Sequence, residues 1–205
     1  MNIKKLFAVL LLSTCAMTAF SQEKGTFEIG LIGGLNLATA QSGSLTNSSS
    51  KIAFNAGVSG DYYFSEKWSL RGKLTYDQKG WNKGYIAAND KIYQTDYTYS
   101  YLTIPVMGNF HFGKTKNWNL NLGPYAGILL SAKESALNTD LKSFSSSFDA
   151  GMAFGLGVKI PVADKIKILL ETELQTGFLD IIKNNQGSAI KNSRGAFNAG
   201  LIFAL

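Results

Sequence analysis

Cysteine and histidine are almost missing from this chain, and so are long apolar runs. Among 205 residues there are one Cys, one His and three Pro. The single Cys, Cys15, lies in an N-terminal segment that we expect to be removed, which leaves no thiol for a disulfide or for catalysis. One His without Cys cannot form the usual zinc sites. No stretch of residues 22–205 is long and apolar enough for a membrane helix.

Residues 1–21 have the three parts of a secretory signal peptide. Lys4 and Lys5 give a positive start, residues 6–12 form an apolar centre, and Ala19-Phe20-Ser21 supplies small residues at the cleavage site. We expect cleavage after Ser21, which leaves residues 22–205 as one domain. The segment ending at Cys15 resembles a lipoprotein cleavage box, but its Thr14 is bulkier than the usual Gly or Ala.

The remaining charge is modest and scattered. Two of the 20 Lys and Arg residues lie in the leader, so 18 stand against 14 Asp and Glu, a net charge of +4. No basic run forms a nucleic-acid-binding stripe, and we expect no nucleic-acid partner. The mean hydropathy of +0.02 is typical of a membrane barrel, because only every second residue of its strands faces lipid.

Eight segments alternate apolar and polar residues, which is the period of a strand with one apolar face. The alternation is cleanest from Phe148 to Ile160. Pro105 falls inside the fourth segment, where it removes a backbone donor and predicts a bulge or local distortion. The predicted strands cover residues 27–37, 52–64, 68–80, 97–112, 118–130, 148–160, 166–178 and 196–205.

The connections between these strands alternate in length. The short ones are residues 65–67, 113–117 and 161–165, and the long polar ones are residues 41–50, 81–96, 132–147 and 179–195. Outer-membrane barrels have short periplasmic turns and longer extracellular loops. We therefore predict an all-β protein of the outer membrane, an eight-stranded antiparallel up-and-down transmembrane β-barrel surrounded by the lipid bilayer.

Alternation alone also fits a lipocalin, whose apolar face points inward around a ligand. Three features favour the membrane barrel: an apolar face nearly free of charge, strands of about a dozen residues that suit a tilted span, and aromatic residues at the strand ends. These aromatics predict two interfacial girdles. They are Tyr62, Phe64, Trp68, Phe112 and Trp118 near the short turns, and Tyr76, Trp81, Tyr93, Tyr97 and Tyr99 near the long loops.

The other face carries the charges, and in a membrane barrel it lines the lumen. An eight-stranded barrel is just wide enough for side chains to fill it. Unpaired charges there would be very costly, so we expect a paired, hydrated network and a plugged lumen. The candidate network consists of Glu28, Asp61, Arg71, Lys73, Asp77, Asp149, Lys159, Lys167, Glu171 and Glu173.

Several segments resemble a known family. They are Gly33-Gly34-Leu35-Asn36, Tyr101-Leu102-Thr103-Ile104-Pro105-Val106, Gly123-Pro124-Tyr125-Ala126-Gly127 and residues 149–157. The aromatic-Leu-x-Ile-Pro segment is the most specific of them. The chain is similar to the Bacteroidota outer-membrane β-barrel domain, also labelled PorT-like or porin family. The resemblance implies the barrel fold and the outer membrane. The name PorT comes from a component of a system that exports proteins across the outer membrane, and that role enters only as an alternative.

Catalytic chemistry finds little support in the sequence. His111, the single His, falls on the inward face near the short turns, where we expect a hydrogen-bonded lumen or turn residue; the neighbouring strands offer no obvious Ser and acid for a triad. Glu171 and Glu173 share a face and could form a carboxylate pair, but salt bridges to Lys159 or Arg71 are the favoured interpretation. We expect no catalytic residue, metal or cofactor.

We therefore favour a non-enzymatic, compact surface, structural or interaction protein whose long loops contact an extracellular ligand or an envelope protein. One alternative is an accessory subunit of an export system; its candidate contacts are two apolar patches, residues 81–86 and 179–182. A narrow channel for small solutes would need a continuous hydrated gap in the lumen. A barrel enzyme would need acids and His111 gathered at one rim.

Overall fold

The computed structural model describes residues 24–42 and 48–205, so the expected leader and its Cys15 lie outside the described residues. One 3-10 turn, η1 (Lys142–Phe144), is the only helical element named in the described part. No helix in those two ranges is long and apolar enough to cross a membrane. The strands are β1 (Phe27–Gln41), β2 (Ser49–Tyr63), β3 (Trp68–Ala88), β4 (Lys91–Phe112), β5 (Trp118–Glu134), β6 (Phe148–Ala163), β7 (Ile166–Gly177) and β8 (Lys191–Ala204).

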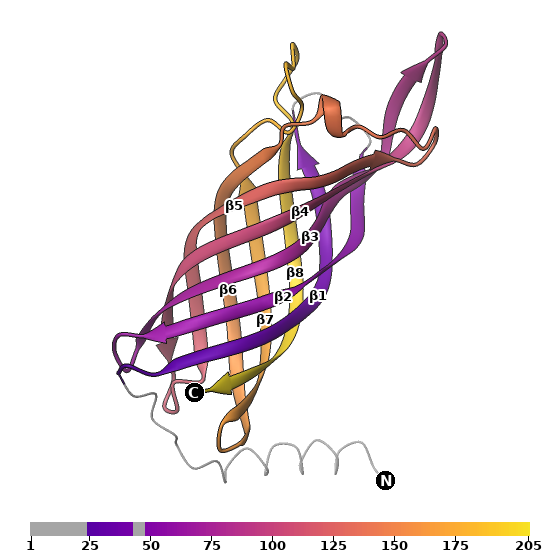
Figure 1. The fold of residues 1–205 in the computed structure, drawn as a ribbon. Coiled ribbons are helices and arrows are strands. Elements are labelled where there is room, and N and C mark those ends of the chain that lie inside the picture. The colour runs from indigo at the N-terminus through magenta and orange to yellow at the C-terminus, as the bar shows by residue number, and fades with distance from the viewer. Residues whose placement is uncertain (1–23, 43–47) are drawn as a thin grey trace, which may run out of the picture.

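The eight strands form a closed ring in sequence order, in which every strand pairs antiparallel with its neighbours. The ring closes between β1 and β8, where Leu31 lies opposite Leu201. Figure 1 shows the strands tilted around one barrel, with the short turns at one end and the long loops at the other. The predicted fold is confirmed.

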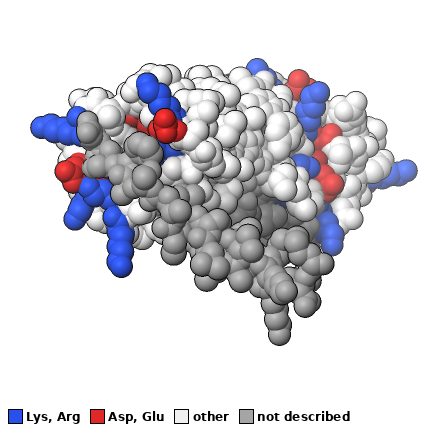
Figure 2. Space-filling model, turned by 90° about the horizontal axis from the view of Figure 1, so that it is seen from below, with Lys and Arg blue, Asp and Glu red and all other residues white. Residues whose placement is uncertain are grey.

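The apolar face of every strand points outward. Leu35 on β1 is 62% exposed, whereas its neighbour Asn36 is fully buried. On β3, Leu74 is 44% exposed and Arg71 only 1%. Charged side chains gather toward the two ends of the view in Figure 2, with a broad uncharged area between them. A polar interior and an apolar outside are the reverse of a lipocalin, so that alternative is excluded.

At the long-loop end, the prediction of a loop over residues 81–96 is wrong. β3 and β4 continue as a paired hairpin that projects beyond the barrel (Figure 1). Its tip is a two-residue turn, Asn89-Asp90, with φ angles of 49° and 59°. Two successive positive φ values match the twist of a hairpin, and Asn and Asp tolerate them best after Gly. The polar composition of this segment therefore concealed a strand pair.

Two aromatics assigned to the long-loop girdle are instead inside the barrel end. Trp81 is 2% exposed and Tyr99 is fully buried. Trp81 lies an even number of residues from the inward Asp77, so period two turns it inward. Gly80, directly before it, has φ of 129°, and a Cβ there would lie 2.1 Å from the Tyr97 carbonyl oxygen. The backbone can therefore bend at this point only with glycine.

The short-turn aromatics all lie on the outer surface, as a girdle requires. Trp68 and Trp118 are 46% and 48% exposed, and Trp68 packs on Phe110 with ring centroids 4.9 Å apart. The distortion expected at Pro105 is an interruption of pairing rather than a bulge. The β3–β4 ladder breaks between Gly72, opposite Val106, and Thr75, opposite Thr103, without a change of register.

Candidate functional site

The most distinctive feature of the interior is a continuous series of ion pairs through the lumen. Twelve side chains of alternating sign belong to it, contributed by β1, β2, β3, β6, β7 and β8. We call them the ion-pair series. In order they are Lys167, Glu28, Lys159, Asp61, Arg71, Glu171, Lys73, Glu173, Arg194, Asp77, Lys79 and Asp149.

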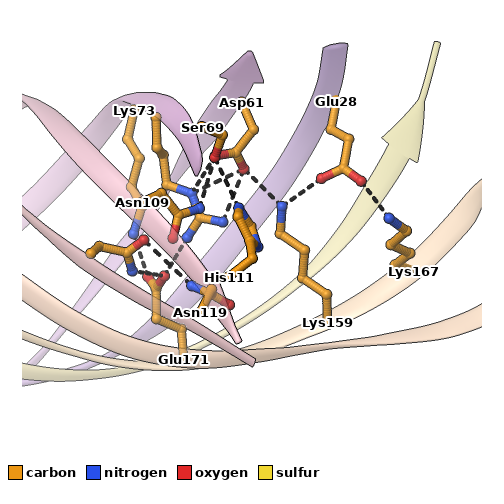
Figure 3. Close-up of polar contacts among 12 residues, drawn as sticks. Glu28, Asp61, Ser69, Lys73, Asn109, His111, Asn119, Lys159, Lys167 and Glu171 are labelled. Carbon is orange, nitrogen blue, oxygen red and sulfur yellow. Dashed lines mark hydrogen bonds and ion pairs between the residues drawn. The ribbon is translucent and has the colours of Figure 1, made fainter. Parts of the chain in front are cut away.

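The series begins near the short turns. Lys167 Nζ lies 2.6 Å from Glu28 Oε1, and Lys159 lies between Glu28 and Asp61, 3.0 Å from Asp61 Oδ2. Arg71 Nε donates to both oxygens of Asp61 at 3.0 Å, and its Nη1 donates to Glu171 Oε2 at 2.6 Å. Figure 3 shows Lys159 reaching both carboxylates, with Lys167 on the other side of Glu28.

The series continues toward the long loops. Lys73 contacts Glu171 and donates to Glu173 Oε2 at 2.6 Å. Arg194 joins the next two carboxylates, with 2.8 Å from its Nη2 to Glu173 Oε1 and 3.0 Å from its Nε to Asp77 Oδ2. Lys79 Nζ lies 3.8 Å from Asp77 Oδ2 and 3.2 Å from Asp149 Oδ2, and Asp149 ends the series.

The series consists of six cations and six anions, so its net charge is zero. Its side chains are at most 3% exposed, apart from Lys167 at 12%. Charges so far from water are tolerable only when they are paired and hydrogen-bonded. Strands β4 and β5 add neutral partners; Asn121 Nδ2, for example, donates to Glu171 Oε2 at 2.9 Å.

The structure brings all ten residues named from the sequence into this one series. Glu171 pairs with Arg71, one of its two expected partners, and with Lys73, while Lys159 pairs elsewhere. Sequence reasoning missed two members. Lys79 lies on the inward face of β3 by the two-residue period. Arg194 lies within residues 179–195, which the sequence predicts as a loop, because β8 begins five residues earlier than predicted.

Contrary to the sequence-based expectation, His111 does have a serine and an acid close by. Ser69 Oγ is 3.0 Å from His111 Nε2, and the same hydroxyl donates to Asp61 Oδ1 at 3.1 Å. The acid therefore contacts the serine rather than the second nitrogen of the imidazole, which is not the order of a catalytic triad. His111 and Ser69 are fully buried, and the His111 ring packs on Tyr63 at 4.8 Å. The site is a structural contact of the lumen.

The family model of the outer membrane protein beta-barrel domain matches residues 20–183. The chain belongs to this family. It is therefore an outer-membrane protein in a lipid environment, with its short turns on the periplasmic side and its long loops outside the cell.

Solved structures of two bacterial barrels have the same fold. The outer membrane protein OprG from Pseudomonas aeruginosa is 11% identical, with a TM-score of 0.55 over 90% of this chain and 98% of that one. Neisserial surface protein A (NspA), from Neisseria, is 20% identical, with a TM-score of 0.52 over 86% of this chain and 96% of that one. No curated protein matches the sequence.

Two concave features lie elsewhere on the barrel, and only the first borders the ion-pair series, at Glu171. A hollow of about 510 Å³ lies on the lipid-facing wall, among outward side chains such as Leu35, Leu170 and Phe197. A second cavity of about 260 Å³ lies at the extracellular end. Among the described residues, no group of three or more His, Cys, Asp or Glu side chains could hold a metal ion.

A carboxylate organises the extracellular loop that follows β5. Glu134 accepts hydrogen bonds from Thr95 Oγ1 at 2.7 Å and from the backbone N–H groups of Ala136, Leu137 and Thr139. Burial alone would raise the pKa of Glu134, but these hydrogen bonds lower it from 4.5 to about 2. Glu134 is the last residue of β5, beyond the membrane-spanning part, and is only 2% exposed, so this loop is held by a buried carboxylate at the extracellular end.

Proposed function

We propose that this protein is a non-enzymatic outer-membrane barrel with a plugged lumen, and that it acts through its extracellular loops. The observation that carries the proposal is the ion-pair series. Its charges are satisfied by one another, so the lumen offers neither a row of free charges for ions nor a free acid or base for catalysis. The extracellular end, by contrast, presents a projecting hairpin, two long loops and an apolar cavity.

Single-channel recording in planar bilayers tests the plugged lumen. We expect no stable conductance steps from the wild-type protein, because water and ions find no continuous path past the paired side chains. The double variant Arg71→Ala and Glu171→Ala removes a central pair and should create measurable steps when it refolds. Reproducible conductance of the wild-type barrel would contradict the proposal and favour the narrow channel.

A second candidate is an accessory role in protein export, and the projecting hairpin favours it. Ile92 and Tyr85 on this hairpin are 75% and 52% exposed, which is unusual for large apolar side chains outside the lipid-facing wall. The resemblance of residues 101–106 to PorT-like barrels of Bacteroidota supports the same role. Mild crosslinking of intact cells should then capture a stoichiometric envelope partner, and Ile92→Ser should abolish the capture; recovery of the barrel alone would exclude this role.

The export leader is part of the proposal. We infer that residues 1–21 are removed after secretion, so that the mature protein begins at Gln22 and contains no Cys. The intact mass of protein purified from outer membranes tests this directly. A mass matching residues 22–205 is expected, and a lipid-modified chain beginning at Cys15 would contradict it.

A further inference from the structure

The cavity at the extracellular end is built from three parts of the chain that are distant in sequence. The base of the β3–β4 hairpin, the loop that contains η1, and the loop before β8 all line it. It joins both apolar patches that the sequence suggested as contact surfaces, through Trp81 of the first and Ile182 of the second. Figure 1 shows the η1 loop crossing this end of the barrel.

Backbone hydrogen bonds hold these loops together around the cavity. Ile181 donates its N–H to the Ile190 carbonyl at 2.9 Å, and Lys183 donates to the Phe144 carbonyl at 2.9 Å. Leu141 is tied to the barrel wall by a bond to the Ala132 carbonyl at 2.8 Å. A cavity fixed in this way is largely formed before anything binds, which lowers the entropic cost of binding.

Aromatic rings form its wall and separate it from the lumen. Trp81 stacks on Tyr97 and on Tyr99, with ring centroids 4.6 Å and 5.7 Å apart. Trp81, Tyr99 and Tyr101 belong to one buried apolar cluster, and Lys79, the last cation of the ion-pair series, lies 5.3 Å from the centre of the Tyr101 ring. The cavity therefore opens toward the outside medium and is closed toward the charged interior.

The polar groups of the wall specify what fits. No charged side chain lines the cavity. The Tyr97 hydroxyl donates to the Tyr85 carbonyl at 2.7 Å, and Ser145 Oγ donates to the Leu141 carbonyl at 2.8 Å, so these groups are already satisfied. Trp81 Nε1 and Tyr99 Oη, in contrast, are buried without a hydrogen-bond partner among the described residues. A buried donor without an acceptor is costly, and an occupant with an acceptor would remove this cost.

We propose that this cavity binds a small, uncharged and mostly apolar molecule that carries one hydrogen-bond acceptor, such as an aryl ketone, ester or amide. Apolar walls with a small number of placed polar groups are typical of small-molecule sites. The inference deepens the proposed function, because it names the ligand class that the extracellular end would bind. It does not depend on whether the lumen conducts, so conductance and binding can fail independently.

Acetophenone is a suitable probe, and ethylbenzene is its near-isosteric partner without the acceptor. The mature protein, labelled with ¹⁵N at its tryptophan indoles and placed in lipid nanodiscs, gives one indole N–H resonance for each of Trp68, Trp81 and Trp118. Trp68 and Trp118 lie on the lipid-facing surface near the periplasmic turns, so they report any partitioning of the probe into lipid. Trp81→Phe identifies the Trp81 resonance.

We expect acetophenone to shift the Trp81 resonance downfield and saturably, while the other two resonances drift linearly at most. One net hydrogen bond predicts that acetophenone binds about fivefold more tightly than ethylbenzene. Ile190→Phe should fill the cavity and abolish the saturable shift. Ile92→Phe, on the exposed hairpin outside the cavity, should leave it unchanged.

A Trp81 response no larger than those of Trp68 and Trp118 would overturn the proposal. Equal affinity for the two probes would overturn the role of the acceptor, and undiminished binding to a folded Ile190→Phe protein would place the site elsewhere. If Ile190→Phe does not refold, Ile182→Phe fills the same cavity from the neighbouring position and serves as the test variant.

Discussion

At the scale of single residues, Glu171 illustrates how the interior is stabilised. Its carboxylate binds Arg71, Lys73 and Asn121. Arg71 and Lys73 each also pair with a second carboxylate. Removing any one member of the series therefore leaves a neighbouring charge uncompensated. In a buried site the cost of such a charge exceeds the attraction that any single pair contributes.

We predict that Glu171→Gln lowers the free energy of unfolding by about 3 kcal/mol or more, because it leaves Arg71 and Lys73 each short of a counter-charge. Urea titration in detergent, followed by the mobility of the folded barrel on gels, measures the change. Glu66→Gln is the matched control, because Glu66 forms an exposed pair with Lys116 at a periplasmic turn and should leave the midpoint nearly unchanged. Equal effects of the two variants would contradict this account of the lumen.

Glu134 predicts a pH response confined to one extracellular loop. Its folded-state pKa of about 2 lies below the ordinary value of 4.5, so its stabilising effect is complete above about pH 4.5 and is lost as the pH falls toward 2. The protection factors of the Leu137 and Thr139 amides should fall over this range while those of the barrel strands do not change. Glu134→Gln should lower these protection factors at neutral pH and remove their pH dependence; an unchanged profile in that variant would refute the assignment.

At the scale of elements, the strands could be predicted where the apolar–polar alternation was strong. The prediction failed where the alternation weakened. The core of β6 stands out because large apolar residues alternate with Asp and Gly. The outer part of β3 and β4 has mixed composition, and its pairing depends on the Asn89-Asp90 turn. In a polar segment this turn cannot be recognised from the sequence pattern. Inward placement of Trp81 follows from counting residues from Asp77, but its cavity depends on loops that no local pattern specifies.

The turn of the β3–β4 hairpin provides a prediction at this scale. Replacing Asn89 and Asp90 by Val places β-branched residues at positive φ, which costs about 1–2 kcal/mol per residue. We expect faster amide exchange in residues 84–95 and no change in the barrel strands. Gln94→Val, on the same hairpin but in extended conformation, is the control; slowed or unchanged exchange in the turn variant would show that the turn does not stabilise the hairpin.

At the scale of the whole molecule, length, alternation and connection lengths were sufficient to predict the barrel. The ten named lumen residues followed from side-chain period alone, because in a closed barrel every inward position must meet others across a narrow interior. The pairing order could not be read from the sequence, since it depends on the stagger of strands that are distant along the chain. The Ser69–His111 contact joins two consecutive strands and depends on their register: Ser69 lies opposite Asn109 and contacts His111 two positions further along β4.

Labelling of single cysteines in intact cells with a membrane-impermeant thiol reagent tests the central claim most directly. Asn89→Cys lies at the hairpin tip, Lys114→Cys in a periplasmic turn, and Thr103→Cys at a fully buried inward position. We predict that Asn89→Cys reacts at once, that Lys114→Cys reacts only after the outer membrane is permeabilised, and that Thr103→Cys does not react in either state. Reaction of Thr103→Cys in intact cells would contradict a plugged lumen, and reaction of Lys114→Cys would contradict the orientation of the barrel.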